Sequence, residues 1–217
     1  MQARDAIRWI RRSGIPLNED VGVLDLGAGH GIFGAELQNH GCSVAFADES
    51  NCLTADLSES TFHQINLDHD DVSELGTYDL VICSNVLEHL SKPFEFLMSM
   101  GTLLKPGGVV YLSWTNWLSP WGGHEFSPFH YLGSRRGHRL YDMLSKRRRL
   151  HTPYVNLFPT YIGKVLAFLR DQPSFRILRA APRYYPEFAF LLAVPIAREF
   201  LTWNCALLIQ NQAGENS

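Results

Sequence analysis

A glycine-rich turn between an apolar strand and a helix constrains this chain more than any other feature. Residues 21–26 are apolar apart from Asp25 and contain β-branched valines, which predicts a buried strand. Residues 32–37 read as a helix that stops at Gly41. Gly27, Gly29 and Gly31 lie between the two, where glycine lets a ligand approach the backbone and the start of the helix offers unpaired N–H groups. The unit therefore predicts a ligand-binding turn at the end of the first strand.

The same alternation of strand and helix continues along the chain. Further strands are expected at residues 43–47, 62–67, 78–84 and 109–114, and helical segments at residues 4–13, 86–90 and 93–104. Alternating elements joined by short loops predict an α/β fold, with a parallel sheet, helices on both faces and ligands beyond the carboxyl ends of the strands.

The alternation breaks after Trp114. Residues 115–159 are rich in aromatic and basic side chains, and we expect them to form an insertion or lid that covers the acceptor side of the sheet. A helix at residues 160–169 and strands at 175–180 and 204–210 complete the pattern. All 217 residues are expected to form one domain.

Composition excludes several classes of protein. A formal net charge of −3 argues against a general nucleic-acid binder. The four cysteines are widely spaced, so neither a zinc ribbon nor a disulfide scaffold is expected, and a reducing, cytoplasmic location fits best. The longest apolar stretch, residues 188–197, is about ten residues long and too short to span a bilayer.

The residues on either side of the glycine turn reduce the number of ligands that it could bind. Nicotinamide, flavin and S-adenosylmethionine proteins all use such a turn, but dinucleotide folds usually have the spacing G-x-G-x-x-G, whereas this chain has G-x-G-x-G. Asp25 precedes Gly27, and a carboxylate there repels pyrophosphate but suits an ammonium or sulfonium group. Asp48 ends the second predicted strand, where its two oxygens can accept hydrogen bonds from ribose hydroxyls.

Four motifs in this order resemble the type-11 class I methyltransferases: Val23–Gly31, Asp48, Tyr78–Leu90 and Leu104–Gly108. The resemblance implies a Rossmann-like fold, with a mainly parallel seven-stranded sheet and an antiparallel last strand. It also implies S-adenosyl-L-methionine as the cofactor.

The same resemblance implies roles for individual residues. Asp25 would orient the methionyl amino group through the loop, the turn residues Gly27, Ala28, Gly29 and Gly31 would pack against the cofactor, Asp48 would hold the ribose and Asn85 would contact the methionyl part. For the adenine amine, Asp68 and Asp71 both fit, Asp70 is not excluded, and a solvated loop is an equally open interpretation.

The methyl acceptor leaves a weaker signature, because alignment of the nucleophile supplies much of the rate of an in-line displacement. Enzymes of this fold that methylate nucleobase amines usually carry a [DNS]-P-P-aromatic motif after the fourth strand. Residues 85–88 keep the asparagine but lack the prolines and the aromatic residue. We therefore expect no nucleic-acid acceptor, and instead oxygen methylation of a small-molecule, sugar or lipid-linked acceptor.

Residues 113–131 are the expected acceptor segment. Their aromatic side chains could stack on a sugar or an apolar acceptor, although packing beneath a loop is the commoner explanation: Trp114, Trp117, Trp121, Phe126 and Phe129. His124 follows two glycines and is the first candidate for a general base, with His130 second. His89 reads as packing or capping. Since His124, Glu125 and His130 lack the His-Glu-x-x-His spacing, no metal site is expected.

Residues 117–133, which contain Trp-Gly-Gly-His-Glu, resemble an actinobacterial-type bacterial subgroup, and residues 182–186 and 194–201 share this resemblance. The subgroup fixes no acceptor. The short region before the first strand suggests that another chain could supply part of the acceptor cover. Two alternatives therefore stay open, an NAD-dependent oxidoreductase and a non-catalytic partner subunit that binds S-adenosylmethionine.

Two surface segments bear on partners. A basic group reads either as a solvated helix face or as a site for a phosphorylated acceptor or an anionic membrane: Arg135, Arg136, Arg139 and residues 146–149. The apolar run at residues 184–200 favours core packing over peripheral membrane contact.

Overall fold

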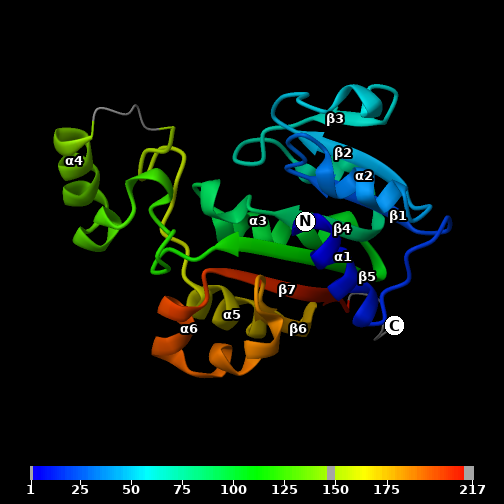
Figure 1. Cartoon of the computed structure of the whole chain (residues 1–217). Helices are drawn as coiled ribbons and strands as arrows, with labels where there is room; N and C mark the ends of the chain where they lie inside the picture. Colours follow the sequence, from blue (N-terminus) through cyan, green and yellow to red (C-terminus); the bar gives the residue numbers. More distant parts are fainter. Residues whose placement is uncertain (1, 146–149, 213–217) are drawn as a thin grey trace.

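The alternating strands form one seven-stranded sheet in the computed structural model, which describes residues 2–145 and 150–212 (Figure 1). The strand order is β3-β2-β1-β4-β5-β7-β6. The bounds are β1 Gly22–Leu26, β2 Ser43–Asp48, β3 Phe62–Gln64, β4 Tyr78–Ser84, β5 Leu104–Thr115, β6 Phe175–Pro182 and β7 Asn204–Asn211. β1 to β5 pair in parallel, and β7 is antiparallel to both β5 and β6. The predicted fold class and antiparallel last strand are confirmed.

Helices cover both faces of the sheet because the central strands are apolar on both sides. In β4, Leu80 and Ile82 pack with α1 (Gln2–Arg12) and α2 (Ile32–Gln38). Val81 and Cys83, on the opposite face, pack with α3 (Pro93–Ser99) and α5 (Ile162–Arg170). Such continuous apolar runs are typical of strands that are buried on both faces.

Short 3-10 helices complete the connections: η1 Ala55–Leu57, η2 Val72–Leu75, η3 Leu87–His89, η4 Met100–Leu103, η5 His124–Phe126, η6 Phe129–Leu132 and η7 Pro186–Ala193. β3 ends at Gln64, three residues earlier than predicted, because a polar turn follows it. In that turn the Asn66 N–H donates to Asp70 and the Asp68 N–H donates to Asn66.

A small lobe occupies the segment that was expected as a lid. It contains η5, η6 and α4 (Ser134–Leu144), and α4 stands apart from the sheet (Figure 1). Trp117, Phe126, Tyr141 and Leu157 form its own apolar cluster. Its role as a lid over the acceptor stays a prediction.

Three of the five aromatic residues considered for the acceptor segment are packed in the interior, which was the commoner of the two explanations, and do not form a stacking surface. Trp114 and Phe126 are fully buried and Trp117 is 5% exposed, because Trp114 packs into the main core and the other two into the core of the lobe. Phe129 packs partly against the same lobe. Trp121 is 58% exposed.

The apolar run after β6 corrects the expectation that it packs in the core. It forms η7 and α6 (Pro195–Leu201), and most of its large side chains face outward instead of packing in the core. Phe190 is 64% exposed and Ile196 is 76% exposed, whereas Leu192 is buried. Within the described residues, no helix combines the length and the apolar character that crossing a bilayer requires.

Candidate functional site

Two adjoining cavities lie at the carboxyl ends of β1, β2 and β4. The first, of about 480 Å³, is lined by Gly27, Asp48, Asp68 and Asn85 among others. The second, of about 340 Å³, is lined by Asp25, Ala28, Gly27 and Asn85. Because Gly27 and Asn85 line both, the two cavities form one groove of the size that small ligands occupy. Most of the predicted cofactor-binding residues therefore meet in one place.

The backbone of the turn requires its glycines. Gly27, Gly29 and Gly31 have φ angles of 71°, 53° and 76°. Residues other than glycine rarely adopt this backbone conformation. A Cβ at Gly27 would lie 2.3 Å from Cγ2 of Val86, and one at Gly31 would lie 2.5 Å from Cδ1 of Leu57. Above Gly29, a Cβ would meet no described atom within 4 Å. Two glycines thus permit packing, and the third leaves the backbone open to a ligand.

Asp48 ties the end of β2 to this turn. Its Oδ2 accepts a hydrogen bond of 2.8 Å from the Gly29 N–H, and its Oδ1 accepts one of 2.7 Å from the Glu49 N–H. The carboxylate therefore has a fixed orientation beside the groove.

Asp25 is buried beneath the turn, with 3% of its surface exposed. Burial raises the pKa of this carboxyl to about 7, against the opposing effect of the Gly34 N–H, which donates to its Oδ2 at 2.8 Å. The charge of Asp48 makes a smaller contribution to this raised value. A positively charged ligand in the groove would favour the ionised form.

Asn85 sits in a left-handed backbone conformation, with φ 59°, directly after β4. Its Oδ1 accepts hydrogen bonds from Nδ2 of Asn204 at 2.7 Å and from Nη1 of Arg183 at 3.2 Å. Asn85 is therefore held in place at the junction of the two cavities.

Arg183 is a groove residue that sequence reasoning missed. Besides Asn85 it contacts Oγ of Ser113 at 3.3 Å, and its buried Nε has no hydrogen-bond partner among the described residues. Arg183 directly follows β6, which runs parallel to β5, so its side chain starts from the same edge of the sheet as the groove. The strand predicted at residues 175–180 ends before this position, whereas β6 extends to Pro182 and so brings Arg183 to this edge.

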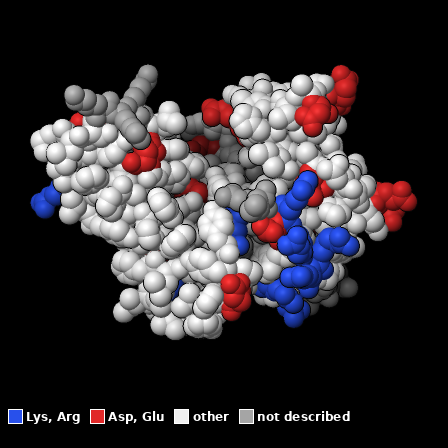
Figure 2. Space-filling view, in the orientation of Figure 1, with Lys and Arg blue, Asp and Glu red and all other residues white. Residues whose placement is uncertain are grey.

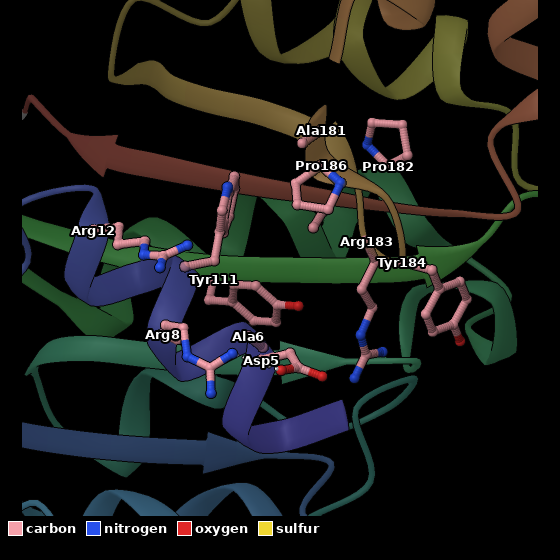
Figure 3. Close-up of a pocket in the computed structure, with 12 residues that line it drawn as sticks. Asp5, Ala6, Arg8, Arg12, Tyr111, Ala181, Pro182, Arg183, Tyr184 and Pro186 are labelled. Atoms are coloured by element: carbon pink, nitrogen blue, oxygen red, sulfur yellow. Dashed lines mark hydrogen bonds and ion pairs between the residues drawn. The ribbon is translucent and has the colours of Figure 1, made fainter. Parts of the chain in front are cut away.

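A third cavity, of about 400 Å³, adjoins the groove at Arg183 (Figure 3). It lies between α1 and the segment after β6, and it combines aromatic and basic side chains: Trp9, Tyr111, Tyr184, Arg8 and Arg12. Arginines of α1 also form the basic patch of Figure 2, whereas acidic side chains line the hollow above it. The groove itself thus carries mainly carboxylates, with Arg183 as a cationic exception.

The structure separates the three aspartates proposed for adenine. Asp68 lines the larger cavity, and its Oδ1 accepts hydrogen bonds from the backbone and hydroxyl of Ser91 at 2.8 and 2.9 Å. Asp71 instead caps η2 through the Ser73 N–H, and Asp70 accepts from the Asn66 N–H. Only Asp68 is brought to the groove with Asp48 and Asn85.

The two candidate bases lie in different surroundings. His130 is 1% exposed, packs edge-on against Trp117, and contacts the carbonyl of Ser119 at 3.0 Å through Nε2. It is a histidine of the lobe's interior and is not brought to the groove. Its burial also lowers its pKa.

His124 belongs to a cluster with His89 and His151. The three ring centroids lie 4.6–5.4 Å apart, and His89 and His151 line the same cavity as Asp48. Burial, together with the neighbouring His151 and His89, lowers the pKa of His124 to about 4. His124 is therefore a neutral imidazole at pH 7, and it lies in a histidine cluster that the sequence did not predict.

The basic group on α4 is only partly described. Arg135, Arg136 and Arg139 are exposed on this helix, as expected of a solvated face. Residues 146–149 lie outside the described part of the chain.

Comparison with known proteins identifies the family of this fold and groove. Residues 2–152 match the family model described as a methyltransferase domain. The chain belongs to this methyltransferase family. The predicted class I methyltransferase resemblance is thereby confirmed, and membership argues against the NAD-dependent oxidoreductase alternative.

Relatives of this chain include proteins of mycobacteria. It is 36% identical over 135 residues to an uncharacterized methyltransferase of Mycolicibacterium paratuberculosis, a match that covers 62% of this chain and 52% of the relative. With an uncharacterized methyltransferase of Mycobacteroides abscessus it shares 30% identity, covering 93% of this chain and 80% of the relative. The chain thus spans about half the length of the first relative and more of the second.

Solved structures show the same fold. An S-adenosylmethionine-dependent methyltransferase from Mesorhizobium loti superposes with a TM-score of 0.62 and 20% identity, over 95% of this chain and 98% of that one. Magnesium protoporphyrin IX methyltransferase from Synechocystis, solved with bound S-adenosylhomocysteine, gives a TM-score of 0.58 and 17% identity, over 96% and 81% of the two chains.

Proposed function

We propose that this chain binds S-adenosylmethionine in the groove at the carboxyl ends of β1, β2 and β4 and transfers its methyl group to an acceptor oxygen. The observation that carries the proposal is the meeting of Asp25, Gly27, Asp48 and Asn85 around one groove. The open backbone above Gly29 and the unpaired Nε of Arg183 fit a bound ligand. When bound, the cofactor supplies an electrophilic methyl group on a sulfonium.

Different residues of the groove would bind different parts of the cofactor. Asp48 offers carboxylate oxygens to ribose hydroxyls, and Asp68 is placed for the adenine amine. Asp25 supplies negative charge beneath the turn, where the methionyl ammonium and the sulfonium need it. Arg183 supplies a cation to the methionyl carboxylate, since a guanidinium pairs well with a carboxylate.

We propose an oxygen of a small-molecule, sugar or lipid-linked molecule as the acceptor. The histidine cluster beside the groove supports this choice, because a hydroxyl must lose its proton as it is methylated. The cluster as a whole, rather than His124 alone, would assist the loss of that proton. The exposed apolar side chains of η7 and α6 support a lipid-linked acceptor or peripheral membrane contact.

Replacing Asp48 with alanine should weaken S-adenosylmethionine binding by about 10- to 100-fold, because hydrogen bonds to a charged group and the anchoring of Gly29 are both lost. Isothermal titration calorimetry measures the change. Asp71→Ala is the matched control, since Asp71 caps η2 away from the groove, and its affinity should equal that of the unaltered chain. Equal affinities for both variants would remove Asp48 from the site.

Replacing Arg183 with glutamine should also weaken cofactor binding by about 10-fold or more, because a charge-assisted hydrogen bond is lost. The loss should be smaller for an adenosine probe that lacks the methionyl carboxylate. Arg179→Gln, at an exposed position on β6, the strand that Arg183 follows, is the control. If Arg183→Gln weakened both probes equally, the pairing with the carboxylate would be refuted.

The test of the whole proposal is transfer of a labelled methyl group from S-adenosylmethionine to molecules in a cell extract. We expect a product 14 Da heavier than its precursor. Cofactor binding without transfer, followed by transfer after a second protein is added, would instead support the non-catalytic partner subunit.

A further inference from the structure

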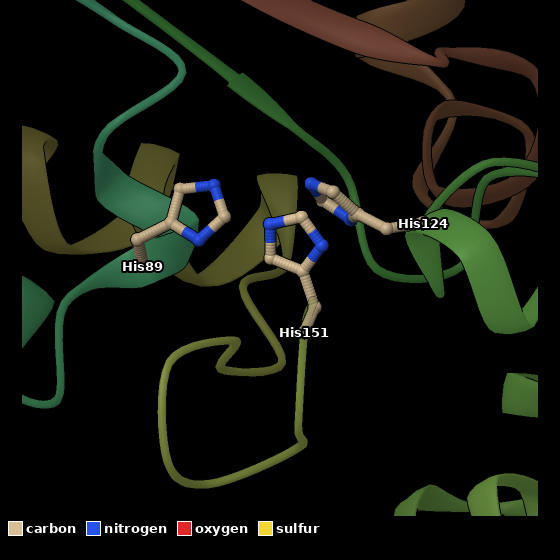
Figure 4. A group of neighbouring side chains, drawn as sticks. All are labelled: His89, His124 and His151. Atoms are coloured by element: carbon tan, nitrogen blue, oxygen red, sulfur yellow. The ribbon is translucent and has the colours of Figure 1, made fainter. Parts of the chain in front are cut away.

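Three histidines from three separate loops converge beside the groove. His89 lies in η3 after β4, His124 in η5 after β5, and His151 in the loop that returns from the lobe (Figure 4). One ring nitrogen from each lies within 4.8 Å of the other two. The rings face one another although their positions in the sequence show no metal-binding spacing.

Hydrogen bonds determine which ring nitrogen carries a lone pair in two of the three. Nδ1 of His89 lies 2.8 Å from the carbonyl oxygen of Asn156, and Nδ1 of His151 lies 2.7 Å from Oε2 of Glu125. A carbonyl and a carboxylate can only accept hydrogen bonds from these rings, so each Nδ1 is the protonated atom. In the neutral form of either ring, Nε2 is therefore the atom with the lone pair that binds a metal.

Glu125 is itself held rigidly. Its Oε1 accepts hydrogen bonds from the backbone N–H groups of Leu150 and His151, at 2.5 and 2.6 Å. A carboxylate bound to the far nitrogen of a histidine is the arrangement that orients metal-ligating histidines and makes them more basic.

His124 supplies the unexplained atom of the cluster. Its Nδ1 is buried and has no hydrogen-bond partner in the described part of the chain. The residue also has a left-handed backbone conformation, with φ 50°. A buried, unpaired ring nitrogen is costly unless a ligand satisfies it.

We infer that His89, His124 and His151 bind one divalent transition metal ion of the zinc class. Tetrahedral zinc with zinc–nitrogen bonds of about 2.0–2.1 Å places ligand atoms about 3.4 Å apart. The ring nitrogens lie within 4.8 Å of one another, so side-chain rotations that bring them closer would close the site on an ion. Three protein ligands leave a fourth position for water or a substrate, as in catalytic rather than structural zinc sites.

The open position would face the proposed reaction. His89 and His151 line the cavity that also contains Asp48 and Asn85. This link to methyl transfer rests on the proposed function: an acceptor hydroxyl bound to the ion would release its proton to solvent more readily. From the sequence, we expected His124, Glu125 and His130 not to form a metal site. The structure instead places His89 and His151 beside His124, and Glu125 supports the cluster through its hydrogen bond with His151.

The test is metal titration of the chelator-treated chain without cofactor. Calorimetry with Zn²⁺ should show one equivalent bound, and Co²⁺ should give the visible absorption of a tetrahedral site. Alanine at His89, His124 or His151 should weaken Zn²⁺ binding by more than about 100-fold, and Glu125→Gln by about 10- to 100-fold. His40→Ala, at a histidine just past the end of α2, should bind as the unaltered chain does.

Several results would overturn the inference. One is the absence of stoichiometric Zn²⁺ binding by the folded, unaltered chain, a result that no variant's misfolding can affect. Another is that the variants Glu125→Gln and His124→Ala bind Zn²⁺ as tightly as the control variant His40→Ala does. Titration of the same samples with S-adenosylmethionine separates the two proposals. Cofactor binding without metal binding refutes the metal site alone, and the reverse refutes the proposed function alone.

Discussion

Replacing Asp25 with asparagine is expected to stabilise the ligand-free chain at pH 8 and, at the same pH, to weaken its binding of S-adenosylmethionine. The asparagine oxygen can still accept the hydrogen bond from the Gly34 N–H, so the variant removes the ionisable group and keeps the contact. The two opposite effects have one cause, the burial of a carboxyl that a cationic ligand needs in its charged form.

The sign follows from the pKa. Burial raises the pKa of Asp25 in the folded chain from 3.8 to about 7, so folding takes up a proton between these values. The stability that the protonated carboxyl contributes is complete below about pH 4 and is lost as the pH rises through 7. The loss amounts to about 4 kcal/mol in free energy of unfolding, because a shift of one pKa unit corresponds to about 1.4 kcal/mol.

Urea denaturation from pH 5 to pH 8 measures this effect. The free energy of unfolding of Asp25→Asn should exceed that of the unaltered chain by an amount that grows with pH. Asp20→Asn, an exposed position before β1, should follow the unaltered chain. Cofactor affinity should rise with pH through 7 in the unaltered chain and stay flat in Asp25→Asn. Parallel stability profiles for Asp25→Asn and Asp20→Asn would show that Asp25 is not the group responsible.

Replacing His124 with alanine is expected to lower methyl transfer by about 100-fold or more while S-adenosylmethionine binds as before, because handling of the acceptor proton typically contributes 10²- to 10⁴-fold. His124 lies in the lobe, whereas the predicted cofactor contacts come from the strand ends, so the effects should separate. Labelled methyl transfer and calorimetry on the same samples measure both.

A second variant separates the imidazole from the backbone. His124 has φ 50°, which asparagine tolerates better than alanine. His124→Asn should therefore keep the fold of the lobe and still lose transfer. If His124→Asn transferred methyl groups as fast as the unaltered chain, this histidine would have no role in the reaction. If both variants lost cofactor affinity, its role would be structural instead.

The fold was largely predictable because its signals are local. Periodicity and turn chemistry indicate the apolar strands, the glycine turn and a helix at residues 32–37. In the structure this helix, α2, ends at Gln38, one residue later. The predicted cofactor residues meet because they follow parallel strands, whose carboxyl ends share one edge. Topology alone therefore brings Asp25, Asp48 and Asn85 together.

The rest of the site was less predictable because it depends on long-range packing. Arg183 reaches Asn85 across 98 positions of sequence, and His89 lies 67 positions from the carbonyl that orients it. For Trp114 and Phe126 the sequence left both stacking and packing open, because the density of aromatic residues does not distinguish an exposed aromatic face from a buried core. In the same way, η7 and α6 looked like core segments but present Phe190 and Ile196 to the surface.

The central claim is that the groove at the carboxyl ends of β1, β2 and β4 binds S-adenosylmethionine, and isothermal titration calorimetry tests it most directly. The chain should bind one equivalent of S-adenosylmethionine or of S-adenosylhomocysteine, with affinity reduced in Asp48→Ala and unchanged in Asp71→Ala. A folded chain that binds neither compound would contradict the claim.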